Sequence, residues 1–391
     1  MRNKGKPHIL CVIYGTELYG SERGTIEALC ALRDEGVQIS VVGSGRKPKG
    51  GQTGEAIAEL GFPLFLIPFG SHLKRSWMVH NRDYRKMIFG RIWRCSRKFK
   101  RIRKELKPTH IMVCGTSPLP FILPALAFNR TKIIYRMGDA PVVSSKIHFP
   151  LWKWLVRRAE IIVTISDFMS SILVQHASRN LDSRKIHVIR NIAPQRPRPI
   201  DQESTASLQR TKRPFQVVFV GQVTEKKGVG PLTEALLELD DPNIGCWILG
   251  EFLGNKEFDE RIQNTLRTSS SRTKIEMVGY VSDPRPYYKA ADWHIAPSTY
   301  EEPLGNVVQE AQLQGTPSIV TNKGGLPELI EHEKTGWLLE TPTPEAIIRC
   351  VQALQGSPDW VDAAESAIHT KSAEFGNVEF RQAWIQALST S

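Results

Sequence analysis

The chain has 391 residues, of which 41% are hydrophobic and 24% are charged, and its net charge is +12. This composition excludes a disordered or collagen-like chain, and the length suffices for two domains that each bury a core of their own. No stretch reaches the roughly 20 consecutive apolar residues of a membrane-spanning helix. The short apolar run at 8–14 has no small-residue cleavage site after it, so it is predicted to be a strand rather than part of a signal peptide.

The positive charge is concentrated in the first half of the chain. Residues 1–200 contain 35 Lys and Arg against 13 Asp and Glu, whereas residues 201–391 contain 17 against 27. A basic half favours anionic partners such as phospholipid head groups, lipid-linked diphosphates, anionic polysaccharide or nucleic acid. The six cysteines show neither CxxC pairs nor the spacing of metal ligands, which favours free thiols and a cytoplasmic location.

The first half of the chain alternates strand and helix patterns, which predicts a Rossmann-like parallel sheet. Strands are expected at 8–14, 37–42, 64–68, 110–114, 132–136 and 161–166. The loop after the first strand lacks the GxGxxG fingerprint, and no acidic residue ends the second strand, so NAD binding is disfavoured. Residues 44–54, which are rich in Gly, Lys and Pro, are expected to form a mobile loop.

A basic amphipathic helix is predicted over residues 84–107. The 4-3-4-3-4 spacing of one helix face is followed by Ile88, Ile92, Cys95, Phe99, Ile102 and Leu106. Such a helix can cover a sheet while its basic side is solvated, or it can lie on an anionic membrane surface as a peripheral contact. No recognised nucleic-acid motif accompanies it, so nucleic acid is not expected as a partner.

The second half begins after a predicted linker at 193–213, which is rich in Pro, Arg, Gln and Ser and has no hydrophobic period. Strands are expected at 215–220, 245–251, 275–281 and 293–296. After the last of these, the stretch Pro297 to Ala311 turns through Pro and Gly and opens a helix. Unpaired N–H groups at such a helix start attract phosphate, here around Gly305, Asn306 and Val307.

Two carboxylates flank that helix start, Glu302 before it and Glu310 about two turns beyond it. At roughly 1.5 Å per helical residue, eight positions separate them by about 12 Å, enough for a diphosphate to lie between two hydroxyl-rich groups. The pattern therefore predicts a nucleotide-sugar site.

The stretch Glu302–Glu310 resembles the signature of glycosyltransferase family 4, retaining enzymes of the GT-B fold in which a Glu–seven residues–Glu segment contacts the donor. The same pattern, in the same order, is fitted by Gly315-Thr316-Pro317, Gly324-Gly325-Leu326-Pro327-Glu328 and Thr335-Gly336-Trp337-Leu338. The loop 221–228 is similar to the family's Gly-Arg-x-x-x-x-Lys-Gly motif, with Lys227 matching and Gln222 in the place of the Arg. The resemblance is strongest over 215–340.

The resemblance implies a GT-B fold, with two Rossmann-like α/β domains that face a central cleft. Residues 1–192 would form the basic acceptor domain, 193–213 the linker, 214–370 the nucleotide-sugar donor domain, and 371–391 a helix that packs back on the first domain. Lys227 and Glu302 are implied to be the catalytic residues. Further contacts to the donor are implied for Gly221, Gln222, Lys226, Gly250, Tyr280, Val281, Leu304, Gly305, Asn306, Val307 and Glu310.

The first domain provides weaker matches to the family. The segment Gly20-Ser21-Glu22 is similar to the end of the family's Gly-Gly-x-Glu segment, with Tyr19 in the place of the first Gly. Many relatives end the strand at 132–136 with a His that contacts the sugar, whereas this sequence has Gly138 near that position. Arg136 and Asp139 are candidates to compensate, which makes both of them expected cleft residues together with Gly20, Ser21 and Glu22.

The implied activity is the retaining transfer of a hexose-type sugar from a UDP- or GDP-linked nucleotide-sugar to a hydroxyl of a glycan, a lipid-linked sugar or a protein. Such an enzyme would serve polysaccharide or other glycoconjugate synthesis, in the cytoplasm at the inner face of a membrane. The sequence has no Asp-x-Asp, so neither a metal nor a cofactor beyond the co-substrate is expected. The departures at Tyr19, Gly138 and Gln222 keep open a non-catalytic GT-B subunit that binds nucleotide or lipid for a partner enzyme. A GT-B sugar-nucleotide epimerase is a third alternative.

Overall fold

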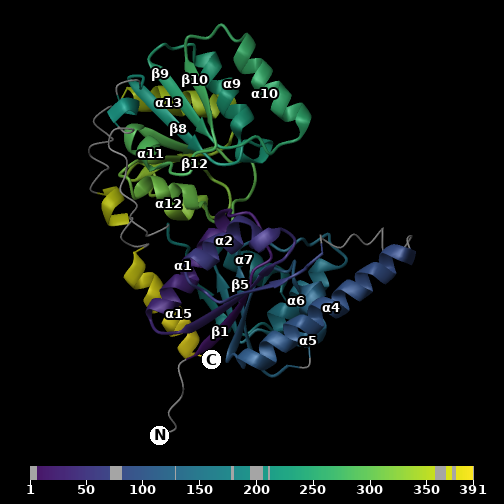
Figure 1. The fold of residues 1–391 in the computed structure, drawn as a ribbon. Helices are drawn as coiled ribbons and strands as arrows, with labels where there is room; N and C mark the ends of the chain where they lie inside the picture. The colour runs from purple at the N-terminus through teal and green to yellow at the C-terminus, as the bar shows by residue number, and fades with distance from the viewer. Residues whose placement is uncertain are drawn as a thin grey trace. The chain divides into compact units, whose positions relative to one another are not determined.

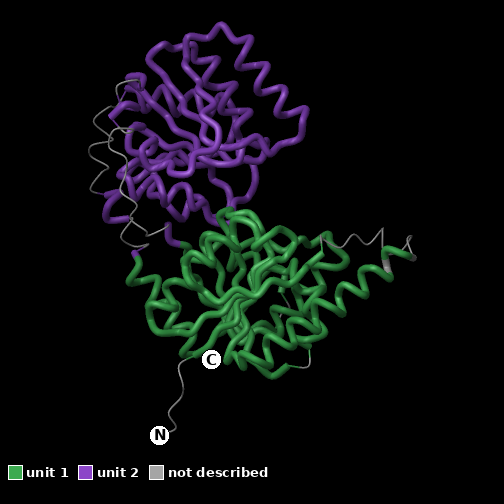
Figure 2. Tube along the Cα trace, in the orientation of Figure 1, with its two compact units in different colours: residues 1–191, 377–391 green, residues 192–376 purple. Residues whose placement is uncertain are grey.

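The computed structural model describes residues 7–70, 82–127, 129–177, 180–193, 206–209, 212–356, 367–371 and 376–390. Most of the predicted linker at 193–213 lies outside the described residues. The chain divides into two compact units, shown in Figure 2: unit 1 comprises residues 1–191 and 377–391, and unit 2 comprises residues 192–376. None of the described helices combines the length and the apolar character that spanning a bilayer requires.

Unit 1 contains a seven-stranded parallel sheet with the strand order β3-β2-β1-β4-β5-β6-β7 (Figure 1). The strands are β1 (His8–Val12), β2 (Gln38–Ser44), β3 (Leu64–Ile67), β4 (His110–Cys114), β5 (Lys132–Met137), β6 (Ile161–Thr164) and β7 (Ile186–Val188). The helices are α1 (Gly20–Asp34), α2 (Gly51–Glu59), α4 (Arg82–Leu106), α5 (Leu119–Leu126), α6 (His148–Arg158), α7 (Asp167–His176) and α15 (Asn377–Ser389), with the short 3₁₀ helices η1 (Pro48–Gly50) and η2 (Ser183–Lys185). The strands are nearly continuous apolar runs because helices cover both faces of a parallel sheet. The six strands expected in this half are confirmed.

The prediction of a mobile loop at 44–54 is wrong. Strand β2 extends to Ser44, and η1 and α2 begin within a few residues of its end. Lys49, Gly50 and Gly51 all have positive φ, of 51°, 88° and 67°. The glycines here permit a tight left-handed turn into a helix, which the composition of the segment could not distinguish from a flexible loop.

The predicted basic helix is confirmed as α4, which packs against α5 and β3. Of the six residues predicted for its apolar face, Ile88, Cys95, Phe99 and Ile102 are at most 3% exposed, whereas Ile92 and Leu106 are half-buried. The last helix, α15, belongs to unit 1 and lies against α1.

Unit 2 contains a six-stranded parallel sheet with the order β10-β9-β8-β11-β12-β13. The strands are β8 (Phe215–Val220), β9 (Ile244–Leu249), β10 (Lys274–Gly279), β11 (Trp293–Ala296), β12 (Ser318–Thr321) and β13 (Gly336–Leu339). The helices are α9 (Val229–Leu239), α10 (Lys256–Thr268), α11 (Arg285–Ala290), α12 (Asn306–Gln312) and α13 (Pro344–Gln355), with the 3₁₀ helices η3 (Glu225–Lys227) and η4 (Leu326–Leu329). The four strands expected in this half are confirmed.

The core of unit 2 has two layers because successive strand residues point to opposite faces. Val217 and Phe219 of β8 pack with residues of α9, α10 and α13, whereas Val218 packs with residues of α11 and α12. Helices therefore cover both faces, and the loops at the strand ends remain for function.

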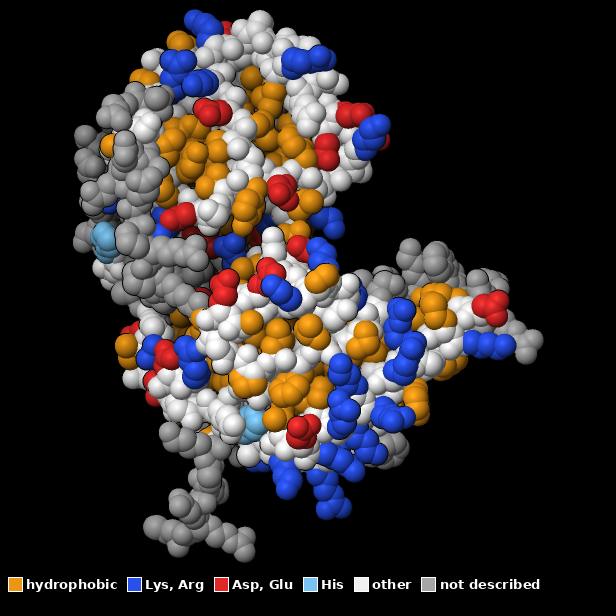
Figure 3. All heavy atoms as spheres, in the orientation of Figure 1, with side chains coloured by type: hydrophobic (Ala, Val, Ile, Leu, Met, Phe, Trp, Pro, Cys, Tyr) orange, Lys and Arg blue, Asp and Glu red, His pale blue; other side chains and the backbone are white. Residues whose placement is uncertain are grey.

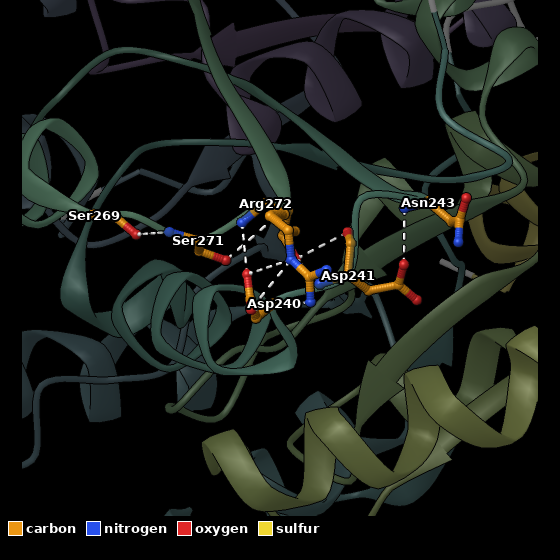
Figure 4. A network of polar contacts seen from close by, with 7 residues as sticks. Asp240, Asp241, Asn243, Ser269, Ser271 and Arg272 are labelled. Carbon is orange, nitrogen blue, oxygen red and sulfur yellow. Dashed lines mark hydrogen bonds and ion pairs between the residues drawn. The ribbon is translucent and has the colours of Figure 1, made fainter.

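A polar network closes the amino-terminal edge of this sheet (Figure 4). Asp240, at the end of α9, accepts hydrogen bonds from the backbone N–H and the guanidinium of Arg272, which precedes β10. Asp241 accepts from the backbone N–H of Asn243 at 2.8 Å. These contacts fix the loops that enter β9 and β10, at the edge opposite the carboxyl ends of the strands.

Candidate functional site

The predicted donor residues of unit 2 gather where its strand order reverses. The reversal lies between β8 and β11, which are neighbours in the sheet although they are far apart in sequence. Ligands of doubly wound sheets bind outside the carboxyl ends of the strands at such a point. The η3 loop with Lys226 and Lys227 follows β8, and the stretch from Pro297 to Glu302 follows β11.

The two predicted catalytic residues are in direct contact. The Lys227 ammonium forms an ion pair with Oε1 of Glu302. The same oxygen accepts a hydrogen bond from Ser298 Oγ at 2.8 Å, and Oε2 accepts one from the hydroxyl of Tyr300 at 2.7 Å. Lys227 Nζ also lies 5.4 Å from the centre of the Tyr300 ring, within the range of a cation–π contact. The carboxylate is thus held by three donors, one of them cationic.

Backbone contacts hold these two loops against each other. The N–H of Thr299 donates to the carbonyl of Lys226 at 2.9 Å. Gly228 has a φ of 76°, and a Cβ on it would overlap the carbonyl oxygen of Pro297. Only glycine allows both the left-handed conformation and this close approach. The Lys-Gly pair of the motif therefore has a physical basis, in which the lysine supplies charge and the glycine supplies space.

The Gly324-Gly325 pair, which follows β12, fixes the backbone of Glu302. Gly325 donates its N–H to the carbonyl of Glu302 at 2.7 Å. Gly324 has a φ of 62°, and a Cβ there would overlap the Glu302 backbone. Both the side chain and the main chain of Glu302 are therefore constrained, and the residue is only 6% exposed.

The remaining predicted donor contacts of this edge follow β8, β9 and β10. Gly250 donates its N–H to the carbonyl of Gly279 at 2.8 Å, and a Cβ on Gly250 would overlap the carbonyl oxygen of Gly221. The structure thus brings Gly221 and Gly250 together, and Tyr280 follows Gly279 with 61% of its surface exposed. Gln222 and Val281 are half-buried at the same edge.

Helix α12 is shorter than the sequence suggested. It begins at Asn306 and has seven residues, so the four residues from Glu302 to Gly305 are not helical. The separation of about 12 Å between Glu302 and Glu310, which assumed a helical rise throughout, does not hold as derived. Leu304 is buried, Gly305 caps the helix with a φ of 105°, and Asn306 and Val307 form its first turn. The cationic side chains beside this helix start are Lys226 and Lys227 of η3.

In unit 1 the candidates lie near the carboxyl ends of β1 and β5. Gly20 opens α1, and Ser21 Oγ donates to Oε2 of Glu22 at 2.9 Å. Burial raises the pKa of the Glu22 carboxyl. A Cβ on Gly138 would lie 3.7 Å from Cβ of Ser21, so Gly138 adjoins this segment. Asp139 follows and is exposed.

Arg136 is bound inside unit 1. It is 2% exposed, and its guanidinium donates to Thr25 Oγ1 at 2.9 Å and to Oδ1 of Asn191. Burial lowers its pKa. These hydrogen bonds join β5 to α1 and to Asn191, the last residue of the first segment of unit 1. Arg136 therefore has a structural role that its place in the sequence did not reveal.

Sequence reasoning missed Ser298 and Tyr300, the two hydroxyl donors to Glu302. Their positions four and two residues before the glutamate carry no periodic signal, because the segment is neither helix nor strand. A search of the described residues finds no group of three or more His, Cys, Asp or Glu placed to hold a metal ion.

The sequence profile of the family described as "Glycosyl transferases group 1" matches residues 201–365. The matched region contains Lys227, Glu302 and all the other predicted donor contacts. The matched region thus includes all six strands of the unit 2 sheet.

Similar proteins extend the likeness beyond this region. An uncharacterized glycosyltransferase of Methanocaldococcus jannaschii is 30% identical over 34% of this chain, and the alignment spans 33% of that protein. The putative colanic acid biosynthesis glycosyltransferase WcaL of Escherichia coli K12 is 25% identical over 73% of this chain and 70% of its own. Among solved structures, HepE of Anabaena in complex with UDP and glucose has a TM-score of 0.76 at 18% identity, over 97% of this chain and 99% of that one. The fold of this chain is therefore GT-B, with two Rossmann-like domains.

Proposed function

We propose that the protein is a glycosyltransferase that moves a hexose-type sugar from a nucleotide-sugar to an acceptor hydroxyl with retention of anomeric configuration. The observation that carries the proposal is the Lys227–Glu302 pair at the point where the strand order of unit 2 reverses. A lysine there stabilises the negative charge that develops on a departing diphosphate, and the rigid loops around it provide a preorganised site. The family match over residues 201–365 supports the same reaction class.

The contacts of Glu302 define its role in this proposal. A carboxylate has about four acceptor positions. Lys227 and Ser298 use two on Oε1, and Tyr300 uses one on Oε2, so Oε2 has capacity for one more donor, such as a sugar hydroxyl. The ammonium and the two hydroxyl groups hold the carboxylate in place, so it is not free to attack the sugar as a nucleophile. We therefore assign Glu302 to orienting the sugar.

The acceptor must then lose its proton to another group. In this proposal the departing diphosphate oxygen takes the proton on the same face of the sugar from which the acceptor attacks. Lys227 supplies the positive charge that a metal provides in other transferases, so activity should persist in excess EDTA. Retention can be tested directly, because the coupling constant of the anomeric proton in the product distinguishes the two configurations.

A UDP-linked hexose is the proposed donor, and a glycan or a lipid-linked sugar the proposed acceptor. The UDP and glucose bound by HepE support the donor, and the colanic acid role in the name of WcaL supports an acceptor in polysaccharide synthesis. In the proposal unit 2 binds the donor and unit 1 the acceptor. Gly221, Gln222, Lys226, Gly250, Tyr280, Val281, Leu304, Gly305, Asn306, Val307 and Glu310 are the proposed further donor contacts.

A thermal-shift screen of UDP-, GDP- and ADP-sugars tests donor binding. A ligand at 100 times its Kd adds about 2.7 kcal/mol, or about 5–10 °C in Tm for a unit of this size. Slow release of nucleoside diphosphate from the selected donor without acceptor would show catalysis. Binding without any release would favour the second candidate, a non-catalytic subunit, for which the observation is the neutral Gln222 in the place of the family's Arg. No shift with any donor would contradict both.

A further inference from the structure

Helix α4 carries two opposite stripes of side chains. Ile88, Cys95, Phe99 and Ile102 face the core of unit 1. The opposite stripe is formed by residues at 4-4-3-4 spacing that are all exposed: Phe89, Trp93, Arg97, Lys100 and Lys104. This spacing places them on one side of the helix.

The first half of the exposed stripe is aromatic. Phe89 is 64% exposed and Trp93 is 61% exposed. These two large aromatic side chains lie one turn apart on the same side of the helix and form a local hydrophobic surface, which is unusual on a helix with so much charge. The Arg97 guanidinium lies 5.1 Å from the centre of the Trp93 ring, so the aromatic and basic halves are continuous.

The second half of the stripe is basic and has basic neighbours. Helix α4 has eleven Lys and Arg against Asp83 and Glu105. Among its described side chains, no Lys or Arg forms an ion pair with an acidic residue. Figure 3 shows Lys and Arg side chains gathered over this helix. The charge is therefore uncompensated and available to an anionic surface.

We propose that α4 binds the surface of an anionic phospholipid bilayer. In this arrangement Phe89 and Trp93 enter the boundary between head groups and acyl chains, and Arg97, Lys100 and Lys104 contact lipid phosphates. The exposed aromatic residues favour a lipid surface as the partner. Rings placed beside cations fit a bilayer surface, where apolar acyl chains lie beneath anionic head groups. A second copy of the chain is disfavoured because two such faces repel each other.

Sedimentation with large unilamellar vesicles tests the proposal with the full-length chain and without any donor. We expect binding to vesicles of phosphatidylcholine with about one third phosphatidylglycerol, and none to phosphatidylcholine alone. Raising the salt from about 0.1 M to about 1 M should weaken binding strongly, because the screening length falls from about 10 Å to about 3 Å.

Two variants separate the halves of the stripe. Replacing Arg97, Lys100 and Lys104 by Gln should weaken binding about 100-fold, at about fivefold per charge. The double variant Phe89→Ser/Trp93→Ser should weaken it by about tenfold per ring, whereas Trp93→Phe should bind like wild type. Circular dichroism and Tm should be unchanged, because all of these side chains are exposed.

The matched control removes three exposed lysines of unit 2, by Lys256→Gln, Lys274→Gln and Lys334→Gln. It changes the net charge equally and should keep wild-type vesicle binding. Equal loss in the control would overturn the proposal by showing that only net charge matters. Equal binding to neutral and anionic vesicles would also overturn it. A third contrary result would be a dimer, seen in sedimentation velocity, that the Phe89→Ser/Trp93→Ser variant abolishes. Binding of single-stranded DNA is measured with the same stripe variants. If they lose DNA binding but still bind vesicles, the stripe is a nucleic-acid surface and the lipid assignment is wrong.

Discussion

The ion pair between Lys227 and Glu302 can be tested by a double-mutant cycle of Lys227→Met, Glu302→Gln and the double variant. Met removes the charge of lysine while keeping an unbranched side chain, and Gln keeps the shape of glutamate. The Glu302 side chain is 8% exposed and that of Lys227 is 27% exposed. Lys227→Met therefore leaves a nearly buried carboxylate with two hydroxyl donors and no counter-charge.

The expected magnitude follows from this exposure. Breaking a fully buried pair costs about 3–5 kcal/mol, whereas an exposed pair contributes about 0.2–1 kcal/mol. The partly exposed lysine places this pair between the limits, so each single substitution should lower the free energy of unfolding by about 2 kcal/mol. That loss corresponds to about 4–8 °C in Tm for a unit of this size. The double variant should lose about 1–2 kcal/mol less than the two single losses combined.

Calorimetry measures the stability of each variant, and release of nucleoside diphosphate measures turnover. Each single substitution should lower turnover by about 10²–10³-fold, and the double variant should not recover it. Stability requires only that the two charges match, whereas the proposed reaction requires both groups at the donor. Additive stability losses would show that the side chains do not interact. Recovery of turnover together with stability would show that the single variants were inactive because they were poorly folded.

Three further features of unit 2 give tests of their own. Burial lowers the pKa of His294 to about 3, so His294 stays unprotonated in the folded state, whereas in the unfolded state it gains a proton below about pH 6.5. Between pH 7.5 and pH 5, the free energy of unfolding measured in urea should therefore fall by about 2 kcal/mol more for wild type than for His294→Asn, and an equal pH dependence of the two proteins would contradict this. Gly228→Ala should lower Tm far more than Gly279→Ala, because both have positive φ but only Gly228 faces a carbonyl oxygen; equal losses would refute the close approach. Tyr300→Phe, which removes one donor to Glu302, should lower turnover by about tenfold and the free energy of unfolding by about 1 kcal/mol, and unaltered kinetics would exclude an orienting role.

The strands were predictable because parallel strands buried on both faces are continuous apolar runs, as in Phe215 to Val220. The proximity of Lys227 and Glu302 was predictable for a related reason. Lys227 and Glu302 each follow such a strand, and the carboxyl ends of neighbouring parallel strands meet at one edge of the sheet. The sequence thus pointed to two loops 75 positions apart, and the structure shows that their side chains pair.

The contacts that depend on three-dimensional packing could not be predicted. Ser298 and Tyr300 bind Glu302 from an irregular segment without periodicity, and the buried Arg136 donates hydrogen bonds to a threonine and an asparagine that are 111 and 55 positions away. The helical turn at Gly50 and Gly51 was mistaken for a loop because glycine serves both structures. In each case the local sequence is compatible with two different structures, and only packing against distant residues decides between them.

Helix α15 has a consequence for the order in which the protein can fold. It completes unit 1 by packing on α1, with Trp384 1% exposed and Arg381 bonded to Asp34 at 2.8 Å. Unit 2 is one continuous segment that the ribosome releases before this helix. During synthesis, therefore, unit 2 can finish folding before unit 1. Until α15 has been synthesised, the surface of α1 that binds it remains uncovered. An expression fragment of unit 2 needs only residues 192–376, whereas one of unit 1 must join residue 191 to residue 377.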